Sequence, residues 1–412
     1  MLPIRRFSKS TSVPVPQSSS TGVTRAVGFW LTGVAAGVYA MVVLGGVTRL
    51  TRSGLSIVEW RPAGEPLPST DTEWDVAFEK YKAFPEYQRV NSRMTLDEFK
   101  PIYFMEWAHR MWGRGLGIAF GVPLAALVVA RAVPSGLGPR LFGLLFLGGT
   151  QGAIGWWMVK SGLDAKRFAP TDTPRVSPYR LATHLTGAWA LYSLLAWTAM
   201  DLLRTSTPPT AAGLNAARAV RPAAIAAATL AGLTTFSGAF VAGNDAGHAY
   251  NDWPFFAGRL VPEDIWEDHL GIRNFFENTA TVQFDHRSLA YATLASVGVL
   301  HVKIARAGGK AVIPRPVFRG AIMLGAAVAA QATLGIVTLM LYVPIALGAA
   351  HQAGALAVWT SALWTLHSVQ SACRLVPVSS PGTRILAASP RAAIAMTAVA
   401  ALATVTPSAG GA

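Results

Sequence analysis

The sequence predicts an all-α polytopic membrane protein with eight transmembrane helices that form two parallel four-helix-bundle repeats. Three observations predict this fold: a low content of charge, eight long apolar runs and an internal repeat. Of the 412 residues, 52% are hydrophobic and only 14% are charged, whereas a soluble domain carries about 25% charged residues. The composition therefore excludes a water-soluble globule, and the many aliphatic residues exclude a disordered chain.

Eight apolar runs are each long enough to cross a bilayer, which takes about 20 residues. They lie at 27–48, 102–130, 140–159, 179–203, 219–242, 279–302, 318–341 and 344–372. The next apolar stretch is interrupted by Pro390 and Arg391, so we interpret it as part of a tail. The chain then divides into an N-terminal segment at 1–26, a first four-helix half at 27–210, a second half at 211–372 and a C-terminal tail at 373–412.

Charges in the connecting loops orient the spans. The loops on one side contain Arg and Lys but no Asp or Glu, and they lie at 1–26, 131–140, 204–218 and 303–317. Because Arg and Lys collect on the inner side of a membrane, both termini are predicted inside and the long loops 49–101 and 243–278 outside. The net charge of +14 is thus assigned to loops beside the lipid bilayer, and no nucleic acid is expected as a partner.

Residues 1–26 contain four basic residues, six serines and no acidic residue. This composition is typical of a mitochondrial transit peptide. Pro3, Pro14 and Pro16 weaken an amphipathic helix, so a basic tail of a bacterial protein is the alternative. The two interpretations correspond to the mitochondrial inner membrane, with the N-terminus on the matrix side, and to a bacterial plasma membrane.

The two halves repeat the same order of motifs. The first and fifth spans end in Gly45-Gly46 and Ser237-Gly238. The second span contains EWAHR at 106–110, and the sixth contains QFDHR at 283–287. The third span contains GTQGAIG at 149–155, and the seventh contains AQATLG at 330–335. The fourth span contains THLTGA at 183–188, and the eighth contains AHQAGA at 350–355. Each half has an even number of spans, so the repeats are parallel, about an axis along the membrane normal.

Four histidines occupy equivalent positions in these repeats: His109, His184, His286 and His351. Each lies about 5–7 residues inside a span that enters from outside, which is a depth of roughly 8–11 Å. Two imidazoles at matching depth can bind the iron of one haem from its two faces. Each half therefore offers one bis-histidine haem site. A lone intramembrane histidine could simply bond a neighbour, but four at equivalent positions favour function.

Charged residues beside the histidines suggest further roles. Arg110 and Arg287 each follow a histidine, and a guanidinium suits the propionates of a haem, although ordinary interfacial placement is the alternative. Glu106 lies one helical turn from His109, whereas the equivalent residue of the second half is Gln283. A carboxyl group can act as an acid or base and an amide cannot. We therefore expect chemistry in the first half and a fixed electron-transfer haem in the second.

The sequence resembles the haem A synthase family of cytochrome oxidase assembly over residues 27–372. The resemblance rests on GGVTRLTRSGLS at 45–56, on the 106–110 motif and on His184, His286 and His351. The segment from Glu86 to Phe104 is similar to the mitochondrial and alphaproteobacterial branch. Some bacterial members carry cysteine pairs in the outer loops, but the single cysteine of this chain, Cys373, leaves no such pair.

This resemblance implies an enzyme that oxidises a ring methyl group of haem O to a formyl group. It implies a resident haem b held by His286 and His351, with the substrate haem near His109 and His184. Glu106 matches a functionally important glutamate of the family. The electron donor implied for a mitochondrial member is a ferredoxin system on the matrix side.

Two other functions share parts of this pattern. A membrane cytochrome b that exchanges electrons with quinone would need the histidines but not Glu106. A parallel-repeat transporter without a redox cofactor would be colourless. The sequence leaves open whether the protein forms a homo-oligomer.

Overall fold

The computed structural model describes residues 21–169, 173–204 and 208–374. These residues form helices and no β-strand, which confirms the all-α class. The eight long helices are α1 (Thr21–Leu50), α4 (Leu96–Val129), α5 (Gly138–Leu163), α6 (Pro178–Leu203), α7 (Ala211–Gly243), α9 (Thr279–Arg306), α11 (Arg315–Met340) and α12 (Ile345–Arg374). The short helices are α2 (Asp71–Lys82), α3 (Pro85–Arg89), α8 (Asn274–Glu277) and α10 (Gly309–Val312).

Among the described residues, 5 helices are long and apolar enough to cross a membrane: α1, α4, α7, α9 and α11. Helices α5, α6 and α12 coincide with the other three predicted runs. The chain is therefore a membrane-helical protein, and the count of eight spans stays a prediction.

Capping residues, rather than apolar composition, determine where two of the helices begin. Helix α4 begins at Leu96, ahead of the predicted span, because Thr95 and Glu98 form a reciprocal capping box. Helix α7 begins at Ala211 because the Thr210 hydroxyl accepts a hydrogen bond from the Gly213 amide. Both helices thus extend beyond the apolar runs at 102–130 and 219–242.

The predicted terminal segments lie mostly beyond the described part of the chain. Residues 1–20 and 375–412 fall outside it, including the apolar stretch interrupted at Pro390. Residues 21–26, predicted as part of the N-terminal segment, instead form the first turns of α1. Cys373 and Arg374 end α12 rather than opening the tail.

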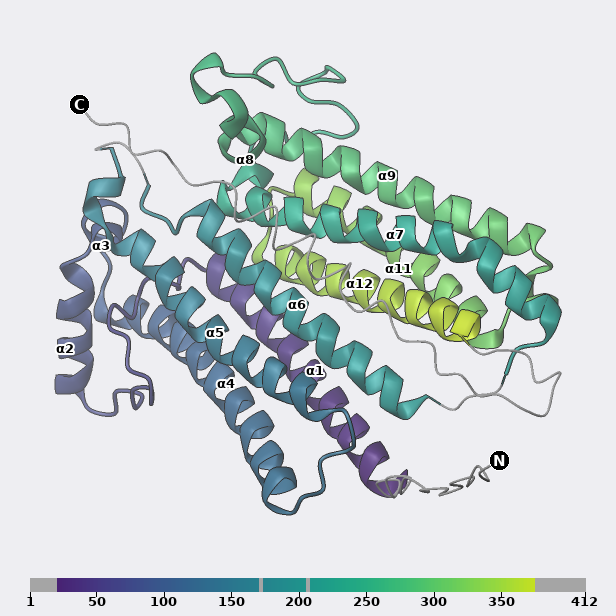
Figure 1. Cartoon of the computed structure of the whole chain (residues 1–412). Coiled ribbons are helices and arrows are strands. Elements are labelled where there is room, and N and C mark those ends of the chain that lie inside the picture. The colour runs from purple at the N-terminus through teal and green to yellow at the C-terminus, as the bar shows by residue number, and fades with distance from the viewer. Residues whose placement is uncertain (1–20, 170–172, 205–207, 375–412) are drawn as a thin grey trace, which may run out of the picture.

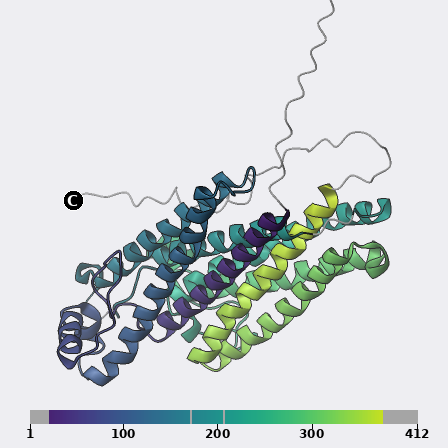
Figure 2. The same cartoon turned by 90° about the horizontal axis from the view of Figure 1, so that it is seen from below.

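The long helices pack in two groups of four. Helix α1 contacts α4 and α6, and α5 contacts the same two helices; in the second group α7 contacts α9 and α12, and α11 contacts both of these. Figure 1 shows the first group in purple to teal and the second in teal to yellow, and Figure 2 shows the same arrangement from below. Helices α6 and α7, and α1 and α12, join the two groups.

Each group surrounds its own buried apolar cluster. The first cluster lies among α1, α4, α5 and α6 and also receives Leu356 and Leu363 from α12. The second lies among α7, α9, α11 and α12. Helix α7 contributes small side chains to it, which lets neighbouring backbones approach closely. These are Ala216, Ala223, Ala224, Ala227, Ala228 and Ala231.

Polar contacts connect the groups at both ends. At the end that carries α2, α3 and α8, here called the loop end (Figure 1), Arg49 of α1 pairs with Asp245 at 2.7 Å. At the opposite end, Asp201 of α6 pairs with Arg140 at 3.1 Å and bonds His367 of α12 at 3.0 Å. His367 is only 5% exposed, and its bond to Asp201 gives its buried Nε2 a partner.

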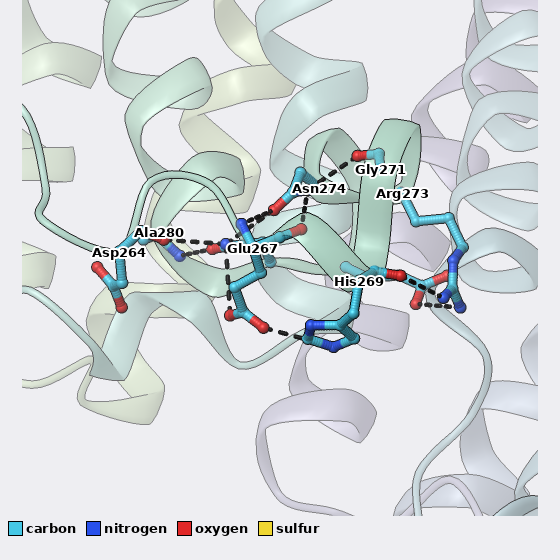
Figure 3. A network of polar contacts seen from close by, with 9 residues as sticks. Asp264, Glu267, His269, Gly271, Arg273, Asn274 and Ala280 are labelled. Carbon is cyan, nitrogen blue, oxygen red and sulfur yellow. Dashed lines mark hydrogen bonds and ion pairs between the residues drawn. The ribbon is translucent and has the colours of Figure 1, made fainter.

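The segment between α7 and α9 is organised by buried asparagines (Figure 3). Asn274 accepts a hydrogen bond from the Glu267 amide at 2.9 Å and donates to the carbonyls of Glu267 and Gly271, each at 2.8 Å. Asn278 caps α9 by accepting from the Ala280 and Thr281 amides. These bonds satisfy the backbone of a loop that has little regular structure.

The segment between α1 and α4 folds around an aromatic cluster that includes Phe78 and Tyr81. Glu86 is buried beside this cluster and accepts a hydrogen bond from the Tyr81 hydroxyl at 3.0 Å. Burial, followed by the nearby carboxylate of Glu106, raises the pKa of Glu86 to about 7, and the Arg52 and Arg49 charges oppose this rise. The loop end therefore contains a carboxyl group that folds most favourably in its neutral form.

We expect the wild-type protein to lose local stability around Glu86 as the pH rises, and Glu86→Gln to abolish this loss. The folded pKa of Glu86 lies above its ordinary value of 4.5, so the stability it contributes is complete below that value and is lost as the pH rises through about 7. Hydrogen exchange of α2 and α3 amides between pH 5 and 8, corrected for intrinsic exchange, measures this. Glu79→Gln, at an exposed position, is the control. An unchanged pH dependence in Glu86→Gln would contradict the assignment.

Candidate functional site

Each of the four predicted histidines packs against a glycine of the preceding long helix. A methyl group added at the glycine would lie 2.8–3.2 Å from the imidazole, closer than ordinary van der Waals contact. Only glycine therefore lets the ring rest directly on the neighbouring backbone. The pairs are Gly45 with His109, Gly155 with His184, Gly238 with His286 and Gly335 with His351. The glycines belonged to the repeat motifs, but sequence reasoning assigned them no such contact.

In the second half, the structure brings the two predicted histidines together. The ring centroids of His286 and His351 are 6.5 Å apart, and their planes meet at 80°. Two imidazoles that share one metal, each at a bond length of about 2.0 Å, have centroids about 6 Å apart. The spacing of this pair therefore fits one iron between them.

Neighbouring side chains hold both of these rings in place. Ser237 Oγ lies 2.8 Å from Nδ1 of His286 and 2.8 Å from the carbonyl oxygen of Thr234. The Gln331 side-chain amide lies 3.0 Å from Nδ1 of His351 and donates to the carbonyl of the same residue at 2.8 Å. Both contacts orient a ring. A bond donated by Nδ1–H also raises the basicity of a metal-binding histidine, and of these two partners only the Ser237 oxygen can accept such a bond.

The equivalent histidines of the first half, His109 and His184, have fewer hydrogen-bond partners than His286 and His351. His109 and His184 interact electrostatically with each other. Within the described residues, however, Nδ1 of His184 and both polar side-chain atoms of Gln151 are buried without a hydrogen bond. Buried polar atoms without partners are rare in native proteins and indicate a missing ligand or solvent molecule. The first site thus has unused polar groups, which fits a site for a bound molecule.

Glu106 is 2% exposed and has partners on both carboxylate oxygens. Oε2 accepts hydrogen bonds from the Ser56 hydroxyl and the Ile57 amide, each at 2.8 Å. Oε1 accepts from Arg110 at 2.6 and 3.1 Å. The carboxylate therefore links helix α4 to the segment that follows α1.

Arg110 extends the same link. Its guanidinium donates to the carbonyl oxygens of Ile57 at 2.6 Å and Glu59 at 2.7 Å. These bonds, with the ion pair to Glu106, hold residues 56–59 against α4. Hydrogen bonds from a charged donor are among the stronger ones in proteins. Arg110 therefore holds this loop firmly against α4.

The second half repeats this arrangement with an uncharged partner. Arg287 donates to Gln283 Oε1 at 2.7 Å and to the carbonyls of Tyr250 at 2.7 Å and Phe255 at 3.0 Å. It also lies 4.0 Å from the ring centre of Phe256. Both motifs therefore use a residue and its i+4 arginine to hold the preceding loop.

The arginines are thus occupied mainly by protein groups. Within the described residues, Arg287 Nε is buried without a partner and remains available to an anion. Haem propionate binding by Arg110 and Arg287 stays a prediction, and their loop contacts were not foreseen because the loop carbonyls lie far away in sequence.

Comparison with known proteins shows the family of the chain. Residues 28–363 match the family model COX15-CtaA, described as "Cytochrome oxidase assembly protein". A protein named "Heme A synthase COX15" from Arabidopsis thaliana is 48% identical over 84% of this chain and 74% of its own length. "Heme A synthase" from Parvibaculum lavamentivorans is 47% identical over 83% and 94%. A "Heme A synthase-mitochondrial ferredoxin fusion protein" from Schizosaccharomyces pombe is 39% identical over 95% and 68%. The family model covers most of the chain, which therefore belongs to the COX15-CtaA family of cytochrome oxidase assembly proteins.

Proposed function

We propose that the chain is a haem A synthase, which oxidises a ring methyl group of haem O to a formyl group and so supplies haem A to cytochrome c oxidase. The observation that carries this proposal is the His286–His351 pair, whose 6.5 Å spacing suits one iron, together with its repeat-equivalent pair His109 and His184. The names of the relatives favour haem A synthesis over the quinone-linked cytochrome b.

The proposed membrane arrangement has all eight long helices as spans, in two parallel four-helix-bundle repeats at 27–210 and 211–372. The equivalent helix contacts of the two groups support it. The basic loops place the end opposite the loop end inside. We propose the mitochondrial inner membrane, with the N-terminus on the matrix side. The mitochondrial relatives support this, and the bacterial relatives keep a plasma membrane as the alternative.

We propose that His286 and His351 hold a resident haem b, while His109 and His184 bind the haem substrate. The contacts of Ser237 and Gln331 to the second pair support a permanent site. Around His184 three polar atoms lack partners, including a ring nitrogen, whereas beside His351 only Gln331 Oε1 does, and this difference supports a site that a substrate completes. Haem b, when bound, supplies one-electron redox chemistry at its iron.

Glu106 is proposed as the proton-exchanging residue of the first half. Its Oε2 accepts a hydrogen bond from the neutral Ser56 hydroxyl. Oε2 can give up this bond and take a proton instead. Its Oε1 stays bonded to Arg110 meanwhile, so the carboxyl group keeps its position. A positioned carboxyl group of this kind contributes about 10²–10⁴-fold to a reaction.

The electron donor is proposed to be a ferredoxin system. The relative whose name joins haem A synthase to a mitochondrial ferredoxin supports this partner. In a fused chain the donor stays close to the enzyme at a high effective concentration.

We expect His286→Ala and His351→Ala to remove the resident haem. Each variant lacks one of the two histidines that would hold the haem iron, so the purified protein should lose its low-spin haem absorbance. His109→Ala and His184→Ala should keep that absorbance and lose haem A production. Absorbance spectra and extracted pigments measure both. Equal loss of one haem signal in all four variants would contradict this division.

Glu106→Gln separates proton exchange from loop positioning. Gln283 shows that an amide at this position still accepts a bond from its i+4 arginine, so the variant should keep its haem spectrum. Its new amide nitrogen would face the Ile57 amide, which is also a donor, so thermal stability should fall modestly. Haem A production should fall about 100-fold or more, the loss typical of a missing acid or base. Normal haem A production in Glu106→Gln would remove the catalytic role.

Gly335→Ala tests the contact between glycine and imidazole. The added methyl group would lie 2.8 Å from Cε1 of His351, so the ring must move away from the iron position. We expect weaker haem retention and a shift from low-spin to high-spin absorbance. Gly298→Ala is the matched control, because nothing lies within 4 Å of the new methyl group there. Identical spectra of the two variants would show that the contact is unimportant.

A further inference from the structure

The two haem sites differ at one residue whose place in the repeat the structure defines. Gly45 and Gly238 are equivalent, because each packs against the histidine of the next long helix, His109 or His286. The residue before the glycine is therefore equivalent as well. It is Leu44 in the first half and Ser237 in the second.

Ser237 can hold His286 in the tautomer that binds a metal. Its oxygen lies 2.8 Å from Nδ1 of His286, and its hydroxyl can donate to the carbonyl oxygen of Thr234, also 2.8 Å away. With the hydroxyl donated in this way, the serine oxygen accepts from Nδ1–H. The lone pair of the ring then lies on Nε2, where a histidine normally binds a metal. The same bond fixes the rotation of the ring.

Leu44 offers no such bond. Its side chain has no polar atom, and within the described part of the chain His109 has no hydrogen-bond partner. The ring of His109 turns Nε2 toward Gly45, whereas His286 turns Cε1 toward Gly238, and no hydrogen bond within the described residues holds His109 in one tautomer. An iron bond to His109 therefore lacks the support that Ser237 gives to His286.

We propose that Ser237 and Leu44 are the positioning residues that make the second haem site retain its haem and the first site exchange one. This inference rests on the proposed function, since it assumes that both sites bind haem. Losing a second contact of a metal-bound histidine typically costs 10–100-fold in affinity. An enzyme that must release its product needs one site of each kind, and a single side chain at this position separates them.

Haem dissociation from the purified protein tests the second site. The resident haem is transferred to excess apomyoglobin, and the rate is followed by absorbance. Ser237→Ala should release haem 10–100-fold faster, and Ser237→Thr, which keeps the hydroxyl group, should restore slow release. Equal rates for wild type and Ser237→Ala would overturn the proposal, as would fast release from Ser237→Thr.

The first site is tested by the reciprocal change. Leu44→Ser is compared with Leu44→Ala, which removes a similar volume without adding a hydroxyl group. Both are loaded with haem b, passed through a desalting column and analysed for haem per chain. Leu44→Ser should retain more haem than Leu44→Ala, with dissociation from its first site slowed 10–100-fold. Equal retention by the two variants would overturn the proposal even if the Ser237 variants did not fold.

Haem A production by the unmodified chain distinguishes the two levels of inference. If haem A forms but the rates of haem release do not depend on Ser237 and Leu44, only this proposal fails. If the unmodified chain retains no haem at all, the proposed function fails and takes this inference with it.

Discussion

The rest of the site depends on the direct contact between four imidazoles and the backbones of neighbouring helices. A histidine in a membrane helix is costly unless its polar atoms are used, and its ring must also hold one orientation to bind a metal. A glycine on the adjacent helix meets the second need, because the ring can then lie against the main chain. The contact recurs in both halves, for instance at Gly238 with His286 and at Gly45 with His109. Through this contact, the distance between two neighbouring helices sets the position of the imidazole ring.

A second constraint closes each site from the loop end. The helix that carries the first histidine of each half also carries an arginine whose guanidinium binds carbonyl oxygens of the preceding loop. Arg110 holds Ile57 and Glu59 in this way, and Arg287 holds Tyr250 and Phe255. The loop is thereby tied to the same helix turn that presents the histidine. A movement of the loop would therefore be transmitted to the site.

The repeat preserves these contacts and varies the chemistry placed on them. Glu106 and Gln283 both accept a bond from an i+4 arginine, but only the first can exchange a proton. Leu44 and Ser237 both precede the glycine that supports a histidine, but only the second can bond the ring. Each difference leaves the local loop and helix contacts alike, as the proposed division into a reaction half and a cofactor half requires.

Sequence alone determined the all-α membrane class, the order of the repeat and the four histidines. These features follow from run length and local spacing, which a single helix expresses without its neighbours. Helix ends were less predictable because caps such as Thr95 and Thr210 extend helices beyond their apolar runs. Only the tertiary structure decided which groups the side chains bond. Glu106 meets the Ile57 amide across 49 residues, as His286 meets Ser237, and no local pattern records a contact between separate helices and loops.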